Sequence, residues 1–230
     1  MIDQSISKFL NSFAHQSELF DRSVAFGQDA ILFKGLLFLS FYVWFWFSMN
    51  PGQERRRIQI ICSLSAVFFT MAVCRGLAHI LPFRERPVND PGLNLVLPYG
   101  VSPQTFDNWS SFPSDNAGLF FALAFGFVYM NRVVGWMAIA WAACFIGLAR
   151  IYLGYHYASD ILGGAMVALA AMLFSHRFVP RSRIVPTLLH WAEHHPGPFY
   201  ACAWVIFYQV ATMFAEPRAI GLVLRRLLFD

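Results

Sequence analysis

Three short clusters of polar residues interrupt a chain that is otherwise mostly apolar. They span His79–Pro87 (HILPFRERP), Ser111–Ala117 (SFPSDNA) and Ala149–Asp160 (ARIYLGYHYASD). Polar side chains are costly at membrane depth, so those that persist beside apolar segments are candidates for a functional site. Together the clusters hold arginines, serines, a histidine and carboxylates, which are groups that can bind an anion and attack it.

The clusters contain groups suited to binding phosphate oxygens. Arg86 and Arg150 carry planar, permanently charged guanidinium groups whose donors match phosphate oxygens. Ser114 lies where an apolar run begins, and Pro113 directly before it suits the start of a helix. Free backbone N–H groups and the helix dipole at such a start attract an anion. These residues predict an oxyanion-binding site.

His156 and Asp160 are four residues apart, about one turn of a helix. At that spacing the carboxylate can accept a hydrogen bond from one imidazole nitrogen and leave the other nitrogen free to attack an electrophile. A carboxylate orients the histidine of a catalytic triad in the same way. For His156 alone, a buried structural histidine is the simpler interpretation. Arg150 and the other two clusters favour a nucleophile instead.

The composition indicates that membrane helices position these clusters. Of the 230 residues, 57% are hydrophobic and 13% are charged, against about 45–50% and about 25% in soluble domains. This excludes a cytosolic enzyme, a disordered tail and a secreted disulfide scaffold. We expect an all-α integral membrane protein, a bundle of six transmembrane helices. The six apolar segments are 30–49, 58–81, 117–130, 133–148, 161–179 and 199–215.

The segment before the first apolar run has a helical periodicity of its own. Among its polar residues recur Ile6, Phe9, Leu10, Phe13, Phe20 and Val24. This pattern is typical of an amphipathic helix that lies on the membrane surface. The acidic residues Asp3, Glu18 and Asp21 in this segment argue against a signal peptide. The chain is therefore divided into an amphipathic interfacial segment, residues 1–28, and a transmembrane domain, residues 29–230.

Six spans place all three clusters on one side of the membrane. The short loops of the other side hold Arg55, Arg56, Arg57, Arg132, Arg177, Arg181 and Arg183. The side of the clusters also holds arginines, namely Arg22, Arg84, Arg86, Arg150, Arg218, Arg225 and Arg226. When those with a chemical role in the site are set aside, the positive-inside rule makes the other side cytoplasmic. We therefore expect a cytoplasmic (inner) membrane protein whose site faces the periplasm or the cell exterior.

Other kinds of site have little support. His190, His194 and His195 have a spacing that suits a metal, but they fall on the opposite side of the membrane from the clusters, so a solvated helix is the simpler interpretation. The four cysteines stand alone, without the CxxC pairing of a zinc site. Basic and aromatic residues are not interleaved as in nucleic-acid-binding proteins. We expect no metal and no nucleic-acid partner.

The clusters resemble the motifs of the type 2 phosphatidic acid phosphatases, which read K-x6-R-P, P-S-G-H and S-R-x5-H-x3-D. The resemblance implies that His156 forms a phosphohistidine and that Asp160 orients it. It also implies that Arg86, Arg150 and Ser114 bind the phosphoryl group, with no metal or other cofactor. The SFPSD variant and the compact size look most like the bacterial undecaprenyl-diphosphatases of bacitracin resistance.

Two residues depart from the family motifs. His79 stands at the lysine position, and Asn116 stands at the position of the histidine that protonates the leaving group. Asparagine cannot act as a general acid, which argues against ordinary alkyl phosphomonoesters as substrates. A phosphate leaving group, with a second pKa of about 6, can depart unprotonated. The sequence therefore favours a diphosphate substrate.

Three residues are candidates to replace what the motifs lack. His79 can bind phosphate when protonated, or supply the missing proton. Arg75, one helical turn earlier, either reaches the phosphate oxygens or pairs with a polar group inside the bundle. Asp115 is a second candidate acid, although a carboxylate at a helix start is more typically an ionised cap.

The leading hypothesis is a membrane phosphatase that acts on a lipid-linked phosphate or diphosphate. Undecaprenyl diphosphate is the expected substrate, and membrane lipids are the other expected partners. A lipid phosphotransferase with the same phosphohistidine is the second hypothesis. A catalytically impaired relative that binds lipid-linked phosphates or partner proteins in envelope polysaccharide assembly is the third. The membrane spans argue against a vanadate-using haloperoxidase, which resembles the same oxyanion site.

Overall fold

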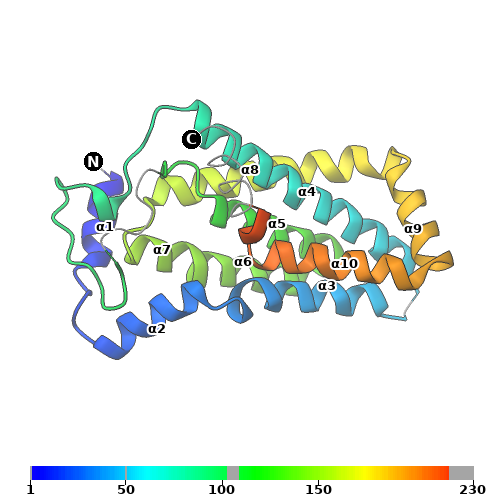
Figure 1. Cartoon of the computed structure of the whole chain (residues 1–230), viewed down its shortest axis with the longest axis horizontal. Helices are drawn as coiled ribbons and strands as arrows, with labels where there is room; N and C mark the ends of the chain where they lie inside the picture. The colour runs from blue at the N-terminus through cyan, green and yellow to red at the C-terminus, as the bar shows by residue number, and fades with distance from the viewer. Residues whose placement is uncertain (1, 50, 103–108, 218–230) are drawn as a thin grey trace.

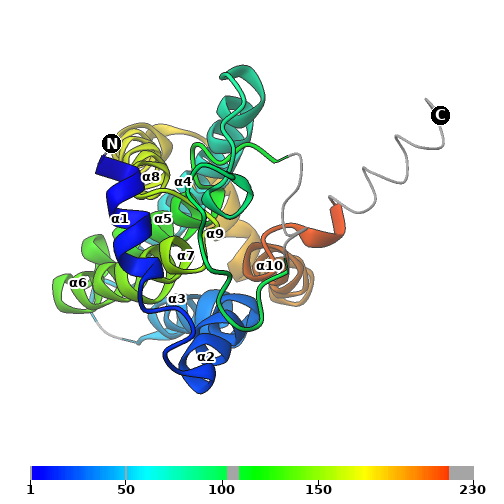
Figure 2. The same ribbon diagram turned by 90° about the vertical axis from the view of Figure 1, so that its left-hand side faces the viewer.

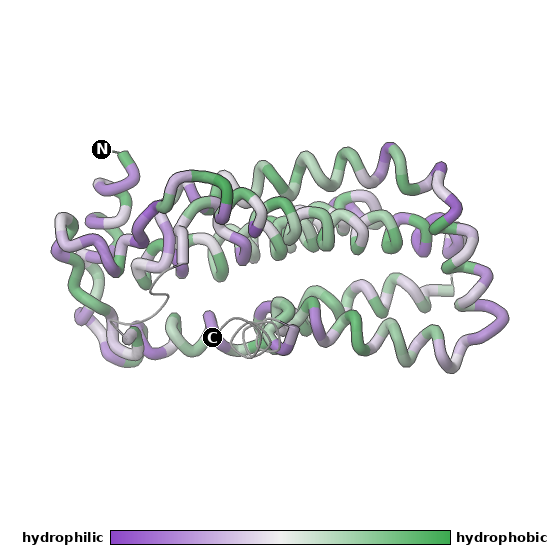
Figure 3. The backbone as a smooth tube through the Cα atoms, turned by 45° about the horizontal axis from the view of Figure 1, so that its top comes forward, coloured by the Kyte–Doolittle hydropathy of each residue, from purple (hydrophilic) through white to green (hydrophobic). Residues whose placement is uncertain are grey.

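The computed structural model describes residues 2–49, 51–102 and 109–217, and over these ranges it contains helices and no strand. The long helices run along one axis and form an elongated bundle (Figure 1). Helix α1 (Ile2–Asn11) lies at one end, and α9 (Ile184–His194) lies at the other. Hydrophobic residues dominate the middle of the bundle and hydrophilic residues gather at both ends (Figure 3), as expected for a chain that crosses a bilayer.

Helix α5 (Asp115–Met130) forms the centre of the bundle. It packs most extensively against α4 (Gln53–Ile80), α8 (Ala158–Phe178) and α6 (Arg132–Trp141), which surround it in the end-on view (Figure 2). Eleven of its residues are buried, including consecutive residues from Asn116 to Ala124. A helix that is apolar on all sides is typically buried on all sides. Helix α5 is therefore the central helix against which its neighbours pack.

Small residues let α5 and α8 approach closely. A Cβ added at Gly164 would lie 2.3 Å from the carbonyl oxygen of Ser114 and 2.9 Å from the backbone nitrogen of Gly118. Only glycine fits such a backbone contact, which is a common way of packing membrane helices. This contact brings the start of α5 against the start of α8.

The number of membrane spans is only partly confirmed. Each of the six predicted apolar segments coincides largely with helix. Among the described residues, however, three helices are long and apolar enough to cross a membrane by themselves: Gln53–Ile80, Arg132–Tyr152 and Ala158–Arg181. The second of these comprises α6, the π-helix η3 (Ala142–Leu148) and α7 (Ala149–Tyr152), and the third comprises α8 and the short η4 (Val179–Arg181). Helix α5, with 16 residues, is about 24 Å long, less than the ~30 Å hydrocarbon core. The six-span count stays a prediction.

The amino-terminal segment forms two helices rather than one. Helix α1 ends at Asn11, and α2 (Glu18–Asp29) begins after the Ser17 cap. Helix α2 and the following η1 (Leu32–Leu36) and α3 (Leu37–Phe47) form a fourth candidate span only if they count as one span bent by 67°. The predicted location of residues 1–28 on the membrane surface stays a prediction.

The remaining elements close the two ends of the bundle. A long loop with the short helix η2 (Pro87–Asn89) joins α4 to α5 beside α1. At the far end α9 turns the chain back, and α10 (Pro196–Ala211) then runs alongside α3 (Figure 1).

Candidate active site

The three polar clusters come together at the end of the bundle that carries α1. They belong to the end of α4 and the loop after it, to the start of α5, and to the stretch from α7 to the first turn of α8. Hydrogen bonds join them: Ser111 donates its backbone N–H to Arg84, and Ser114 donates its own to the carbonyl oxygen of Asp160. Segments far apart in the sequence therefore form one site.

His156 is buried at the centre of this site, with 1% of its surface exposed. Its Nδ1 lies 2.9 Å from the backbone carbonyl oxygen of Ser111. Because a carbonyl oxygen only accepts hydrogen bonds, Nδ1 is the protonated nitrogen. Nε2 then carries the lone pair that a nucleophile needs.

Asp160 is fully buried and receives several hydrogen bonds. Its Oδ2 accepts from the Ser111 hydroxyl at 2.5 Å and from the Tyr157 backbone N–H at 2.7 Å. Arg84 Nη1 lies 2.7 Å from Oδ1. The distance from His156 Nδ1 to Oδ2 is 3.6 Å, longer than a hydrogen bond. The carboxylate therefore acts on the imidazole mainly through its charge and through Ser111, which contacts both groups.

Arg84 and Ser111 are site residues that spacing alone does not single out. Arg84 is held between two carboxylates, because its Nη2 also lies 2.8 Å from Asp3 on α1. It further donates to the Ser159 hydroxyl, and its guanidinium lies over the ring of Tyr157. The only sequence signals were their positions inside the polar clusters, in RERP and in SFPSD.

Arg86 lies directly beside the free nitrogen of His156. Its Nη1 donates to the carbonyl oxygen of Tyr155 at 2.8 Å and lies 3.1 Å from His156 Nε2. Burial, together with the nearby charge of Arg150, lowers the pKa of Arg86 to about 10, so it remains charged at neutral pH. This cation therefore faces any group that Nε2 attacks.

Arg150 is buried on the other side of the site. Its guanidinium lies over the ring of Tyr155, and its Nη1 is 3.4 Å from Oε1 of Gln28 on α2. Gln28 is itself buried and donates to the carbonyl oxygen of Phe145 at 2.6 Å. Sequence reasoning missed Gln28, because nothing in the local pattern of α2 shows that it meets a residue 122 positions away.

Ser114 caps the start of α5, as predicted from the Pro113-Ser114 pair. Its hydroxyl accepts a hydrogen bond from the backbone N–H of Ala117 at 3.3 Å. The buried amino end of α5 thus lies beside His156 and Asp160, where its dipole favours an anion.

The residues after the cap form a charged cluster. Asn116 contacts Oδ1 of Asp115 through its backbone nitrogen at 2.8 Å and its side-chain nitrogen at 3.3 Å. Arg75 Nε lies 3.9 Å from the same carboxylate, and its Nη2 donates to the carbonyl oxygen of Met213. Arg75 thus contacts polar groups inside the bundle, and its contact with phosphate oxygens stays a prediction. Asp115 is also within electrostatic range of Arg86, Arg150 and His156.

Comparison with known proteins identifies the family. Residues 59–184, more than half of the chain, match the PAP2 superfamily. The chain belongs to this superfamily. The resemblance drawn from the motifs is thus confirmed.

Curated relatives of this PAP2 protein share modest identity with it. Undecaprenyl-diphosphatase BcrC of Bacillus subtilis (strain 168) is 23% identical over 178 residues, 77% of this chain and 84% of the relative. Bacitracin transport permease protein BcrC of Bacillus licheniformis is 31% identical over 103 residues, 45% of this chain and 47% of the relative. YbjG of Escherichia coli (strain K12) is 26% identical over 135 residues, 59% of this chain and 62% of the relative. No solved structure matches the chain.

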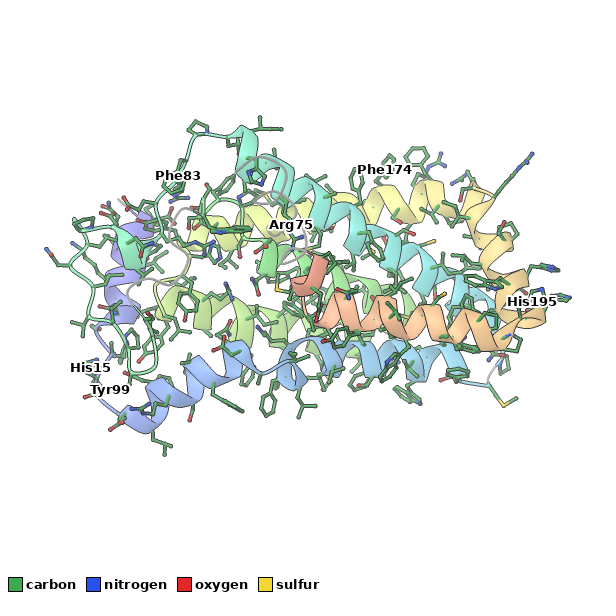
Figure 4. The ribbon with its side chains drawn as sticks, viewed as in Figure 1. His15, Arg75, Phe83, Tyr99, Phe174 and His195 are labelled. Carbon is green, nitrogen blue, oxygen red and sulfur yellow. The ribbon has the colours of Figure 1, made fainter. Side chains whose placement is uncertain are left out.

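Among the predicted PAP2 motif residues, His79 does not contact the other residues of the site. It is exposed in the last turn of α4, and no hydrogen bond or ion pair joins it to another residue in the described part of the chain. The histidine cluster of α9 lies at the far end of the bundle, as the position of His195 in Figure 4 shows. Among the residues that the structure describes, no group of three or more His, Cys, Asp or Glu side chains could hold a metal ion.

Proposed function

We propose that this PAP2 protein is a membrane phosphatase that removes the terminal phosphate of a polyprenyl diphosphate, with undecaprenyl diphosphate as the substrate. The observation that carries the proposal is the environment of His156: Nδ1 is tied to the Ser111 carbonyl oxygen, and Nε2 faces Arg86. The name of the Bacillus subtilis relative supports the substrate class.

In the first step, Nε2 of His156 attacks the terminal phosphorus atom. A bond forms between nitrogen and phosphorus, and the bond from phosphorus to the bridging oxygen breaks, giving a phosphohistidine and a lipid monophosphate. Arg86, Arg150 and the amino end of α5 at Ser114 stabilise the negative charge of the transferred group. Asp160, paired with Arg84, offsets the positive charge that develops on the imidazole.

The leaving group explains why Asn116 is tolerated. Cleavage of an alkyl phosphate releases a basic alkoxide, which needs a proton from a general acid. Cleavage of a diphosphate releases a phosphate, which with a second pKa of about 6 departs without a proton. Asparagine at position 116 is therefore compatible with diphosphate hydrolysis.

In the second step, water attacks the phosphohistidine, the bond from nitrogen to phosphorus breaks, and inorganic phosphate leaves. If a lipid hydroxyl replaced water, the same intermediate would make the protein a phosphotransferase. We place the site on the periplasmic or outer face of the cytoplasmic membrane, because the arginine-rich turns lie at the other end of the bundle.

The proposal is tested by phosphate release from the purified protein in detergent with EDTA. Undecaprenyl diphosphate, undecaprenyl phosphate and phosphatidic acid are offered side by side, with His156→Ala as the control. We expect turnover of the diphosphate, its loss in the variant, and an acid-labile, alkali-stable phosphoryl label on the wild-type protein alone. Faster turnover of either monophosphate, or turnover that survives His156→Ala, would overturn the proposal.

A further inference from the structure

A large apolar groove runs along the side of the bundle next to the candidate active site. Its volume is about 1010 Å³, at the upper end of the roughly 300–1,000 Å³ of ordinary ligand pockets. Helices α2 and η1 form one wall, and α6, η3 and α7 form the other. Its aromatic and aliphatic lining includes Phe20, Phe26, Phe33, Trp141, Phe145 and Leu148. Several of these side chains are about half exposed, so the groove is open to a hydrocarbon chain from the bilayer.

The groove leads to the phosphate-binding arginine. Ala149 and Tyr152 line it, and Arg150 lies between them in α7. On the opposite wall Gly27 lines the groove, and the next residue, Gln28, contacts Arg150. A lipid in the groove would therefore have its polar head beside Arg150.

Lys34 is the one lysine on this wall, and the mechanism above does not use it. It lies in η1, lines the groove and is half-buried. No hydrogen bond or salt bridge ties it to another described residue, although it is within electrostatic range of Arg150 and of the carboxylates of Asp29 and Asp115. An ammonium group in an apolar, membrane-facing position is costly unless it meets an anion. Since Arg150 is also cationic, the two side chains together suit a ligand with two anionic groups.

We propose that Lys34 binds the phosphate that remains attached to the lipid, while the isoprenoid chain of the substrate lies in the groove. This inference rests on the proposed function. With the terminal phosphate at His156 and Arg150, the second phosphate extends toward Lys34. As the bond to the bridging oxygen breaks, charge develops on that second phosphate, and Lys34 stabilises it electrostatically. The ammonium group thus stabilises the leaving group by its charge. In the family motif a histidine, replaced here by Asn116, stabilises the leaving group by protonating it.

The charge part of the proposal is tested with Lys34→Met, which removes the ammonium group at similar side-chain length. We expect kcat/KM for undecaprenyl diphosphate to fall about 10- to 100-fold, the usual range for a lost charged hydrogen bond. Hydrolysis of undecaprenyl phosphate, which lacks the second phosphate, should stay within about twofold of its own low wild-type rate. Lys34→Arg should restore most of the diphosphate activity. Lys8→Met, in the exposed part of α1, is the matched control.

The groove part is tested with Gly27→Trp. Gly27 lines the groove and a Cβ added there meets no atom within 4 Å, so a side chain can start at this position and take up space in the groove. We expect a higher KM for undecaprenyl diphosphate and unchanged hydrolysis of isopentenyl diphosphate, which is too short to occupy the groove. Gly197→Trp, at an equally open helical glycine in α10, is the control.

A binding measurement keeps this test separate from that of the proposed function. Affinity for a polyprenyl methylenediphosphonate is measured on the His156→Ala protein, which needs no turnover. Lys34→Met should weaken binding about tenfold or more, and Gly27→Trp should weaken it for the long-chain analogue only. If neither variant changes affinity or the ratio of diphosphate to monophosphate hydrolysis, the proposal is wrong and bilayer lipid occupies the groove.

Discussion

Arg84 Nη1 lies 2.7 Å from Oδ1 of Asp160, so the carboxylate expected to orient the proposed nucleophile His156 is itself paired with an arginine. The same guanidinium reaches Asp3 at 2.8 Å, which ties the amino-terminal helix to the site. The backbone N–H of Ser159 and its hydroxyl also bond to Asp3. Helix α1 is thus part of the scaffold that holds Asp160 in place.

We predict that Arg84→Met lowers kcat by about tenfold or more, because an unpaired buried carboxylate is unstable and shifts from its position. Asp3→Ala is the matched control, since it removes the other partner of Arg84 and leaves the pair with Asp160 in place. It should change kcat by less than about threefold and act mainly on thermal stability. Equal loss of kcat in both variants would show that Arg84 acts only by anchoring α1.

The pH dependence of kcat/KM should reveal the lowered pKa of the buried His156 side chain. Burial, reinforced by the charges of Arg86 and Arg150 and partly opposed by Asp160, lowers the pKa of His156 to about 4 from its usual 6.5. Because the attacking nitrogen must be unprotonated, we expect activity on the diphosphate to hold between pH 5 and 8 and to fall only as the pH approaches 4. An acid limb near pH 6.5 would contradict this prediction.

The same lowered pKa affects stability. Between pH 6.5 and pH 4 the unfolded chain binds a proton at His156 and the folded protein does not. Stability therefore rises with pH over this window and is lost as the pH falls through it. His156→Gln, which cannot titrate, should show a shallower dependence of the melting temperature on pH. Identical slopes for the two proteins would argue against a buried neutral histidine.

Asn116→His should restore the missing general acid. Its side chain extends from the first turn of α5 beside Asp115, close to the charged groups of the site. A positioned acid contributes about 10²–10⁴-fold, so we expect hydrolysis of phosphatidic acid to rise at least about tenfold, with little change for the diphosphate. The double variant with His156→Ala is the control. An unchanged monophosphate rate would show that the leaving group does not reach position 116.

Gly164→Ala should disturb the site through the contact between α5 and α8. The added methyl group would overlap the Ser114 carbonyl oxygen at 2.3 Å and force α5 and α8 apart. We expect a loss of about 1–3 kcal/mol in stability together with reduced kcat, since Ser114 and Asp160 are joined across this contact. Gly76→Ala, where a methyl group meets no atom within 4 Å, is the control and should leave stability unchanged or higher. The comparison is made by thermal unfolding in detergent.

Composition and motif spacing suffice to predict the membrane class, the helical architecture and the family. They also locate the segments of the site, because the apolar runs end where the polar clusters begin. The sequence did not decide whether His79 binds phosphate or supplies a proton. In the structure its side chain is exposed at the end of α4. The two-part amino-terminal segment was also not predicted, since the break after Asn11 interrupts an apolar periodicity that reads as continuous.

The partners of the candidate catalytic groups were decided only by the tertiary structure. Asp3 meets Ser159 and Gln28 meets Arg150 across more than 120 residues of sequence. Lys34, on another helix, is likewise within electrostatic range of Arg150. Such contacts depend on how closely α5 packs against its neighbours and on where each helix ends. Local hydrophobic periodicity determines which residues form a helix, but side chains from different helices meet only after those helices have packed.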